Sequence, residues 1–263
     1  MLSWLESIVV SGDRMPLLND SANGVALQPD QLREYAGLLG LQWECGPLGD
    51  CGYRHVVRTD YEAILDMAPL GVSYNLGHAH ADSSTFLIWA KGCELLVDTG
   101  ISTYNAGCRR DYERSTRAHN TVVIDSENSS KVWGAFRCAQ RANLVVEDDG
   151  PECFTLWHDG YSDKGIGCRR SFLCKNDTME VVDVVEGNVS SIADAYFHLS
   201  PDVKIISVEN NRVVTDRAVF IFNGQASIQL IKEEIAKEYN VLQPTVCIQV
   251  TFSNRLHTII GEF

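Results

Sequence analysis

Three side chains that can bind protons or metal ions occur at every second position of Gly77–Asp82. They are His78, His80 and Asp82, and an alanine separates each from the next. In a β-strand successive side chains point to opposite faces, so we expect these three to project from one face and the alanines from the other. A stable core does not require two imidazoles and a carboxylate on one face. The pattern favours proton transfer or metal binding, with a solvated strand face as the alternative.

Two further segments carry side chains of the same kinds. Asp98 directly follows the apolar run Leu95–Val97, and His119 lies in the polar segment Arg114–Thr121, which runs into the apolar residues Val122–Ile124. An aspartate followed by Thr-Gly at the end of a strand is commonly a turn residue. The chemistry of these segments therefore depends on whether the fold brings them to Gly77–Asp82.

Several other motif-based interpretations are weak. A His-x-His pair on a strand is typical of cupins, but the glutamate that cupins place shortly afterwards is replaced here by Ser84 and Thr85. Two histidines and one carboxylate could also hold iron for oxygenase chemistry, which metal analysis would decide. The sequence contains no glycine-rich phosphate loop, nucleophile elbow or His-Glu-x-x-His helix.

The three segments together resemble the heparinase II/III family of polysaccharide lyases. Gly-His-x-His-x-Asp starts at Gly77, Leu-Val-Asp-Thr-Gly at Leu96, and Arg-Ser-Thr-x-Ala-His-Asn-Thr at Arg114, in the family's order and at similar separations. The resemblance runs from about Pro16 to Pro201 and corresponds to the family's C-terminal β-sandwich domain. Further pieces that match the family are Pro16–Asp20, Lys131–Phe136 and Tyr196–Pro201.

The resemblance implies cleavage of uronic-acid-containing polysaccharides by β-elimination. That reaction removes the proton at C5, next to the sugar carboxylate, and expels the 4-O-linked sugar, so it needs a base, charge neutralisation and an acid. Histidine suits the base because its unperturbed pKa is about 6.5, and the resemblance assigns His78 to this role. Tyr104, in the loop after Asp98, is a candidate acid for the leaving oxygen; a packed surface tyrosine is the alternative.

The resemblance also implies a zinc ion bound by His80, Asp98 and His119. Two imidazoles and one carboxylate are usual zinc ligands, and here the ion would fix the sheet and orient His78 rather than act as a Lewis acid. Asp82 is a reserve ligand or a support for one of the histidines. Hydrogen-bonded core histidines are the alternative.

Charge narrows the range of partners. The net charge is −13, from 35 acidic and 22 basic residues, which argues against nucleic acid or an anionic membrane as a partner. Arg110 and Arg114 belong to a local basic run and could hold the uronates of an anionic polysaccharide in bidentate fashion. Arg114 could equally brace the loop before His119. Nine cysteines without a C-x-x-C pair indicate reduced structural thiols.

From about Tyr53 onward the sequence predicts strands joined by short turns. Many strands without intervening helices favour a mainly β fold, a large antiparallel β-sandwich of the supersandwich type. Turn dipeptides flanked by apolar runs predict three hairpins. They span Phe86–Val97 around Lys91-Gly92, Val203–Val214 around Asn210-Asn211, and Ala218–Ile231 around Asn223-Gly224.

The beginning of the chain is different in character. Pro29–Gly40 predicts a helix, with proline and aspartate in its first turn and a glycine at its end. Residues 1–46 are too few for a core of their own, and the resemblance implies that they are the remnant of an α/α toroid domain. We expect residues 47–263 to form the β-sandwich.

The resemblance leaves part of the active site outside this sequence. Full-length lyases of this type carry a large helical toroid that forms the other wall of the cleft and supplies a catalytic tyrosine. We therefore expect this chain to hold half of an active site and to have little or no activity alone. The alternative is a zinc-stabilised carbohydrate-binding module without chemistry. Heparan-type chains, alginate and bacterial capsular or exopolysaccharide uronates would all fit as substrates.

The start of the chain bears on the cellular compartment. Met1–Glu6 lacks a basic region and an acid interrupts its apolar part, so it does not predict a secretory signal. A complete chain would be cytoplasmic, whereas a fragment of a longer protein could be periplasmic or secreted. No apolar run in the sequence approaches the length of a membrane span.

Overall fold

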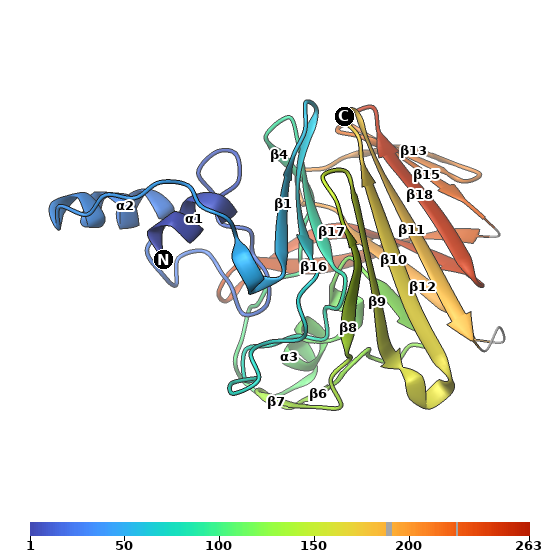
Figure 1. The fold of residues 1–263 in the computed structure, drawn as a ribbon. Coiled ribbons are helices and arrows are strands. Elements are labelled where there is room, and N and C mark those ends of the chain that lie inside the picture. Colours follow the sequence, from blue (N-terminus) through green and yellow to red (C-terminus); the bar gives the residue numbers. More distant parts are fainter. Residues whose placement is uncertain (188–190, 225) are drawn as a thin grey trace.

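The computed structural model describes residues 1–187, 191–224 and 226–263 and consists mainly of antiparallel β-sheet (Figure 1). The largest sheet has eight strands, and alternate residues of its central strands are buried, which is the pattern of a sheet with one face on the core. Its strands in spatial order are β13 (Ile205–Glu209), β14 (Arg212–Thr215), β15 (Val219–Asn223), β18 (Arg255–Gly261), β11 (Thr178–Gly187), β10 (Ile166–Cys174), β9 (Cys153–Tyr161) and β8 (Leu144–Asp149).

Two four-stranded sheets share one hydrophobic core with the eight-stranded sheet. An isolated bridge between Leu96 and Leu199 connects these two smaller sheets. The predicted antiparallel sandwich is thereby confirmed. The first small sheet has the order β1 (Tyr53–Val57), β2 (Tyr61–Asp66), β3 (Phe86–Ala90) and β4 (Cys93–Leu96), and the second β16 (Ala226–Glu238), β17 (Val241–Phe252), β12 (Ala193–His198) and β5 (Val122–Ile124).

Aromatic side chains join the sheets at the centre of the core. The ring of Phe86 on β3 lies 5.4 Å from that of Phe172 on β10 and 6.3 Å from that of Phe197 on β12. All three side chains are almost completely buried. Burying an aromatic side chain contributes roughly 1.5–3 kcal/mol, so this contact stabilises the start of β3, which follows the segment Gly77–Asp82 in the chain.

The helices lie outside the sandwich. Helices α1 (Leu2–Ile8) and α2 (Pro29–Leu38) extend to one side of it (Figure 1), and α2 ends two residues before the predicted Gly40. The other helical turns are α3 (Cys108–Glu113) and the 3-10 turns Gly49–Cys51, Thr116–Ala118 and Ser162–Lys164. In the described part of the chain, no helix is long and apolar enough to cross a bilayer. The residues that join the N-terminal segment to the first small sheet are Ile8, Val10, Leu18, Ile64, Leu87 and Trp89.

Two of the three predicted hairpins are confirmed. β3 pairs with β4 and β13 pairs with β14. The third hairpin is wrong, because β15 pairs with β14 and β18 whereas β16 pairs with β17. After Asn223-Gly224 the chain passes from one sheet to another, and Gln225 lies outside the described residues. A short hairpin, β6 (Lys131–Trp133) with β7 (Arg137–Ala139), lies near α3 at the edge of the molecule (Figure 1).

Candidate active site

The stretch Gly77–Asp82 is a loop leading into β3, so the predicted strand is wrong. Its backbone groups find partners outside any sheet. The Arg114 guanidinium donates to the carbonyl of Ala79 at 2.9 and 3.1 Å, and the Ala81 N–H donates to the carbonyl of Arg114 at 3.0 Å. Because these bonds satisfy the buried backbone, the segment needs no neighbouring strand.

Asp20 links three of the residues that the sequence singled out. Its carboxylate accepts from His78 Nδ1 at 2.9 Å and from His80 Nε2 at 2.8 Å, and both terminal nitrogens of Arg110 donate to it. Burial opposes ionisation of Asp20, but its bonds to His80 and Arg110 outweigh this and hold its pKa well below the usual range. Reasoning from the sequence assigned no role to Asp20; its position in the family-like segment Pro16–Asp20 was the available signal.

His78 combines exposure with a fixed orientation. Its side chain is 61% exposed, whereas that of Asp20 is 4% exposed. Because the ionised Asp20 can only accept, His78 Nδ1 carries a proton, and in the neutral ring Nε2 keeps its lone pair. The ring of Tyr104 lies 6.1 Å from that of His78 in an edge-on arrangement. Both residues predicted to be catalytic are therefore neighbours, and His78 is oriented to act as a base.

His80 and His119 are held in parallel ways by two carboxylates. His80 Nε2 contacts Asp20, and His119 Nδ1 donates to Asp98 Oδ2 at 2.7 Å. The two rings are 5.3 Å apart, and both histidines are fully buried. Burial lowers the pKa of His80 to about 4, so its ring is neutral near neutral pH. The pKa of His119 is raised because Asp98 outweighs the opposing effect of burial.

The chemistry of these residues fits a zinc ion. Seven buried side-chain atoms have no hydrogen-bond partner in the described part of the chain, and three of them belong to this cluster: His80 Nδ1, His119 Nε2 and Asp82 Oδ2. Two imidazole nitrogens and a carboxylate oxygen are a usual zinc donor set. Asp98, the carboxylate ligand predicted from the sequence, accepts a hydrogen bond from His119 Nδ1. Carboxylates commonly orient ligating histidines in this way, and direct binding of an ion by Asp98 stays a prediction. These donors are not all within 4.8 Å of one another, so binding would require side-chain adjustment.

The two arginines predicted to bind substrate are both buried. The guanidinium of Arg110 bonds Asp20 and the carbonyl of Ala135. Its central carbon lies 5.3 Å from the ring centroid of Tyr104 and 5.7 Å from that of Phe136, and these two rings stack on each other. Arg114 donates to backbone carbonyls alone among the described contacts, which favours its bracing role. Binding of a uronate by either arginine stays a prediction.

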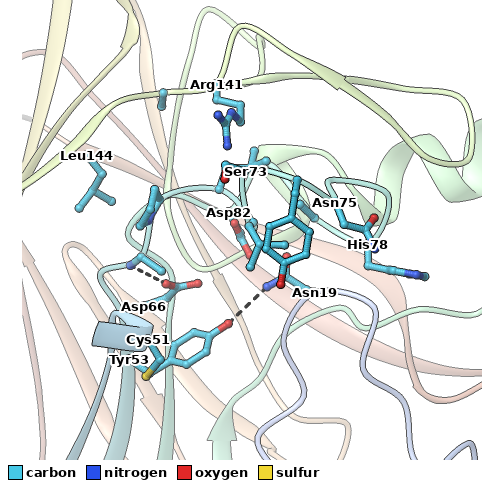
Figure 2. Close-up of a pocket in the computed structure, with 18 of the residues that line it drawn as sticks. Asn19, Cys51, Tyr53, Asp66, Ser73, Asn75, His78, Asp82, Arg141 and Leu144 are labelled. Carbon is cyan, nitrogen blue, oxygen red and sulfur yellow. Dashed lines mark hydrogen bonds between the residues drawn. The ribbon is translucent and has the colours of Figure 1, made fainter. Parts of the chain in front are cut away.

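A cleft of about 1070 Å³ opens beside this cluster (Figure 2). His78 and Asp82 line it together with Tyr53 and Asp66, and Arg141 reaches toward it from the opposite side. Burial, with the nearby Asp98, raises the pKa of Asp82 to about 6, and burial with Asp82 raises that of Asp66 well above its usual range. A cation beside Asp82 would favour its ionised form. Asp66 was not predicted from the sequence.

Comparison with known proteins agrees with the fold. The sequence profile of the family described as heparinase II/III-like, C-terminal, matches residues 43–260. A mutant of heparan sulfate lyase HepC from Pedobacter heparinus is 19% identical, with a TM-score of 0.74 over 97% of this chain and 45% of that chain. A structure of heparinase III is 15% identical, with a TM-score of 0.67 over 99% of this chain and 47% of that chain.

These structural matches cover almost all of this chain but less than half of each solved structure named above. No curated protein sequence matches it. At such low identity the structures show a shared fold, while the profile match covers most of this chain. Asp20 lies before the matched residues.

Proposed function

Because this chain belongs to the heparinase II/III-like C-terminal family, we propose that it forms the β-sandwich half of a polysaccharide lyase active site. The substrate class is a uronic-acid-containing polysaccharide, cleaved by β-elimination. The observation that carries the proposal is the pair of Asp20 and His78. A buried carboxylate holds one nitrogen of an otherwise exposed imidazole at the edge of a cleft, which is the arrangement of an oriented general base.

The reaction then assigns one task to each group. His78 Nε2 takes the proton from C5 of the uronate, and the C5–H electron pair forms the C4–C5 double bond. The bond between C4 and the glycosidic oxygen breaks, and that oxygen leaves with its electron pair and takes up a proton. Tyr104, whose ring lies beside His78, is the candidate donor from this chain. Asp20 stays ionised and stabilises the imidazolium formed at His78.

Zinc forms a second part of the proposal. His80 Nδ1 and His119 Nε2 would hold the ion, with Asp98 or Asp82 as the carboxylate ligand. Asp82 is the better candidate for the carboxylate ligand because one of its oxygens has no hydrogen-bond partner among the described residues. Both oxygens of Asp98 are already bonded, one to His119 and the other to the N–H of Gly100. The bound ion would supply positive charge that fixes this buried cluster. His78 would stay free of the ion because its exposed ring lies at the margin of the cleft and shares only Asp20 with His80.

The remainder of the active site would come from a helical domain. The named relatives are more than twice as long as the part of them that this chain matches. One of these relatives is a heparan sulfate lyase, which supports an anionic polysaccharide as the substrate. Segments α1 and α2 would form the junction to that domain.

The deciding experiment replaces His78 in a protein that contains both the sandwich and the helical domain. We expect His78→Ala to lower the rate of formation of unsaturated uronide by about 10²–10⁴-fold, with metal content and folding unchanged. His257→Ala is a matched control, because His257 lies on β18 and pairs with Glu180. Unchanged turnover of His78→Ala would favour the alternative, a zinc-stabilised carbohydrate-binding module.

A further inference from the structure

A second group of metal-binding side chains lies on the sheet formed by β16, β17, β12 and β5. His198 on β12 is directly opposite Cys247 on β17, and Cys247 is opposite Ile231 on β16. Glu233 follows Ile231 by two residues and therefore points to the same face. The register alone brings imidazole, thiol and carboxylate together.

The three side chains are close and shielded from water. Each offers a ligand atom, and these atoms all lie within 4.8 Å of one another. Within residues 1–187, 191–224 and 226–263, this is the one group of three histidine, cysteine, aspartate or glutamate side chains that meets this distance. His198 and Cys247 are fully buried, and the side chain of Glu233 is 10% exposed.

Hydrogen bonds fix which nitrogen of His198 is available. Its Nε2 lies 3.0 Å from the carbonyl oxygen of Arg117, which can only accept, so Nε2 carries a proton. Its Nδ1 faces Glu233 Oε1 at 2.5 Å, and the hydroxyl of Tyr112 donates to the other oxygen of Glu233 at 3.0 Å. A neutral imidazole in this position would direct a lone pair at a carboxylate. Positive charge is required between Nδ1 and Glu233, either a proton or a metal ion.

The electrostatics of the cluster agree with that requirement. Burial alone would lower the pKa of His198, but Cys247 and Glu233 together raise it well above its usual range. The pKa of Glu233 is lowered because His198 and Tyr112 outweigh the opposing effect of burial.

We propose that His198 Nδ1, the carboxylate of Glu233 and Cys247 Sγ form a second metal site, which takes zinc or a similar divalent cation with affinity for thiolate. Imidazole, carboxylate and thiolate are all zinc ligands. Binding displaces the protons on Nδ1 and Sγ to solvent, with no change in oxidation state. The carbonyl of Arg117 orients the imidazole. The ion would tie β12, β17 and β16 together beneath the segment that contains Tyr112 and Arg117.

Sulfur distinguishes this site from the one proposed at His80 and His119. Cobalt(II) substitutes for zinc and gives a thiolate-to-metal charge-transfer absorption in the near ultraviolet only when a cysteine is a ligand. The 263-residue chain would be produced with cobalt present while it folds, because the site is buried, and then freed of loosely bound metal. We expect the charge-transfer band in the unaltered chain.

Variants assign the band to its ligands. Cys247→Ser should abolish it, whereas Cys174→Ser, which alters another fully buried strand cysteine, should leave it unchanged. The double variant His80→Ala and His119→Ala should lose cobalt from the other site and keep the band. A band of equal intensity in Cys247→Ser, or no band in the unaltered chain, would overturn the proposal. Neither readout depends on lyase activity.

A milder variant covers the case in which Cys247→Ser does not fold. Glu233→Gln keeps the size of the side chain and its bond to Tyr112, but removes the negative charge. We expect it to retain the fold by circular dichroism and to bind cobalt about tenfold more weakly or worse. Unchanged cobalt affinity and an unchanged spectrum in Glu233→Gln would contradict the assignment.

Discussion

Asp20 shows how one side chain can set the state of several others. Its two oxygens receive bonds from His78, His80 and Arg110, and the guanidinium supplies a fixed positive charge. Without that charge a buried carboxylate beside two imidazoles would be costly to keep ionised. With it, the same group orients the exposed imidazole of His78 and the buried imidazole of His80.

Replacing Asp20 therefore has two separate consequences. Asp20→Asn leaves Arg110 buried without a counter-ion, which we expect to lower the free energy of unfolding by about 3–5 kcal/mol, measured by urea denaturation. In a protein with the helical domain, turnover should also fall by about 10²-fold or more, because the asparagine amide no longer enforces a proton on His78 Nδ1. Asp163→Asn, in an exposed turn, is the matched control. Full stability and turnover in Asp20→Asn would refute the role of this carboxylate.

Residue types and spacing predicted part of this cluster. The family-like motifs pointed to His78, His80, Asp98 and His119. In the structure these residues are connected through Asp20, the 5.3 Å approach of the rings of His80 and His119, and the bond between His119 and Asp98. The sequence could not assign Asp20, since its partners are between 58 and 90 positions away and an isolated aspartate has no distinguishing pattern. The sequence likewise could not show that Arg110 pairs with Asp20, and its binding of a uronate stays a prediction.

At the level of elements, strand pairings between neighbouring segments were predicted correctly, whereas pairings and contacts between distant segments were not. Hairpins with short turns depend on local sequence, and β3–β4 and β13–β14 were predicted correctly. The pairing of β15 with β18 joins distant segments, which an Asn-Gly dipeptide cannot reveal. Gly77–Asp82 has the alternation of a strand, yet its backbone is satisfied by Arg114 and by Asn19. Alternation predicts a strand when one face is buried and the other exposed. Here Ala79, His80 and Ala81 are all buried, so the alternation does not mark a strand.

The junction between α1 and the first small sheet should respond to pH. His55 on β1 contacts the carbonyl of Ser7 in α1 at 2.8 Å and the carboxylate of Glu62 on β2 at 2.6 Å. Burial opposes the charge on His55, but Glu62 and Ser7 outweigh it and raise its pKa. The pKa of Glu62 is lowered because His55 and Ser11 outweigh burial. Both groups are therefore charged between about pH 4.5 and pH 6.5.

The sign of the effect follows from the direction of each shift. A raised histidine pKa gives stability that is complete below about pH 6.5 and is lost as pH rises through the folded-state pKa. A lowered glutamate pKa gives stability that is lost as pH falls through its folded-state value. We expect the free energy of unfolding to decline as pH rises above about 6.5 and through the raised pKa of His55, and the decline to be smaller in His55→Gln. Equal slopes for the two proteins, measured by urea denaturation, would rule out this contribution.

For the whole molecule, the proposed division of the active site predicts how activity is distributed. We expect the 263-residue chain alone to form unsaturated uronide at least about 10²-fold more slowly than a protein that also contains a helical domain, because half of the positioning groups would be missing. The ultraviolet absorbance of the product on heparan-type chains, alginate and capsular uronates provides the measurement. Comparable turnover by the chain alone would show that the sandwich is sufficient.

The surface of the N-terminal segment agrees with a junction of this kind. Apolar side chains on and after α2 are largely exposed, including Leu38 at 79% and Tyr35 at 56%. Exposed apolar side chains of this kind, where they adjoin one another, commonly mark a contact with another protein segment. The sequence predicted the helix from its punctuation, but not which of its faces is left uncovered.

The position of Asp20 has a practical consequence for dissecting or recombining these domains. The family profile begins at residue 43, and an excision made at that boundary would keep every strand of the sandwich and discard the carboxylate beneath His78. In the proposed lyase, the group that orients His78 therefore lies before the profile boundary, as do Ile8, Val10 and Leu18, which pack against the first small sheet. Chimaeras that exchange helical domains should be joined before Pro16, so that this carboxylate travels with its arginine.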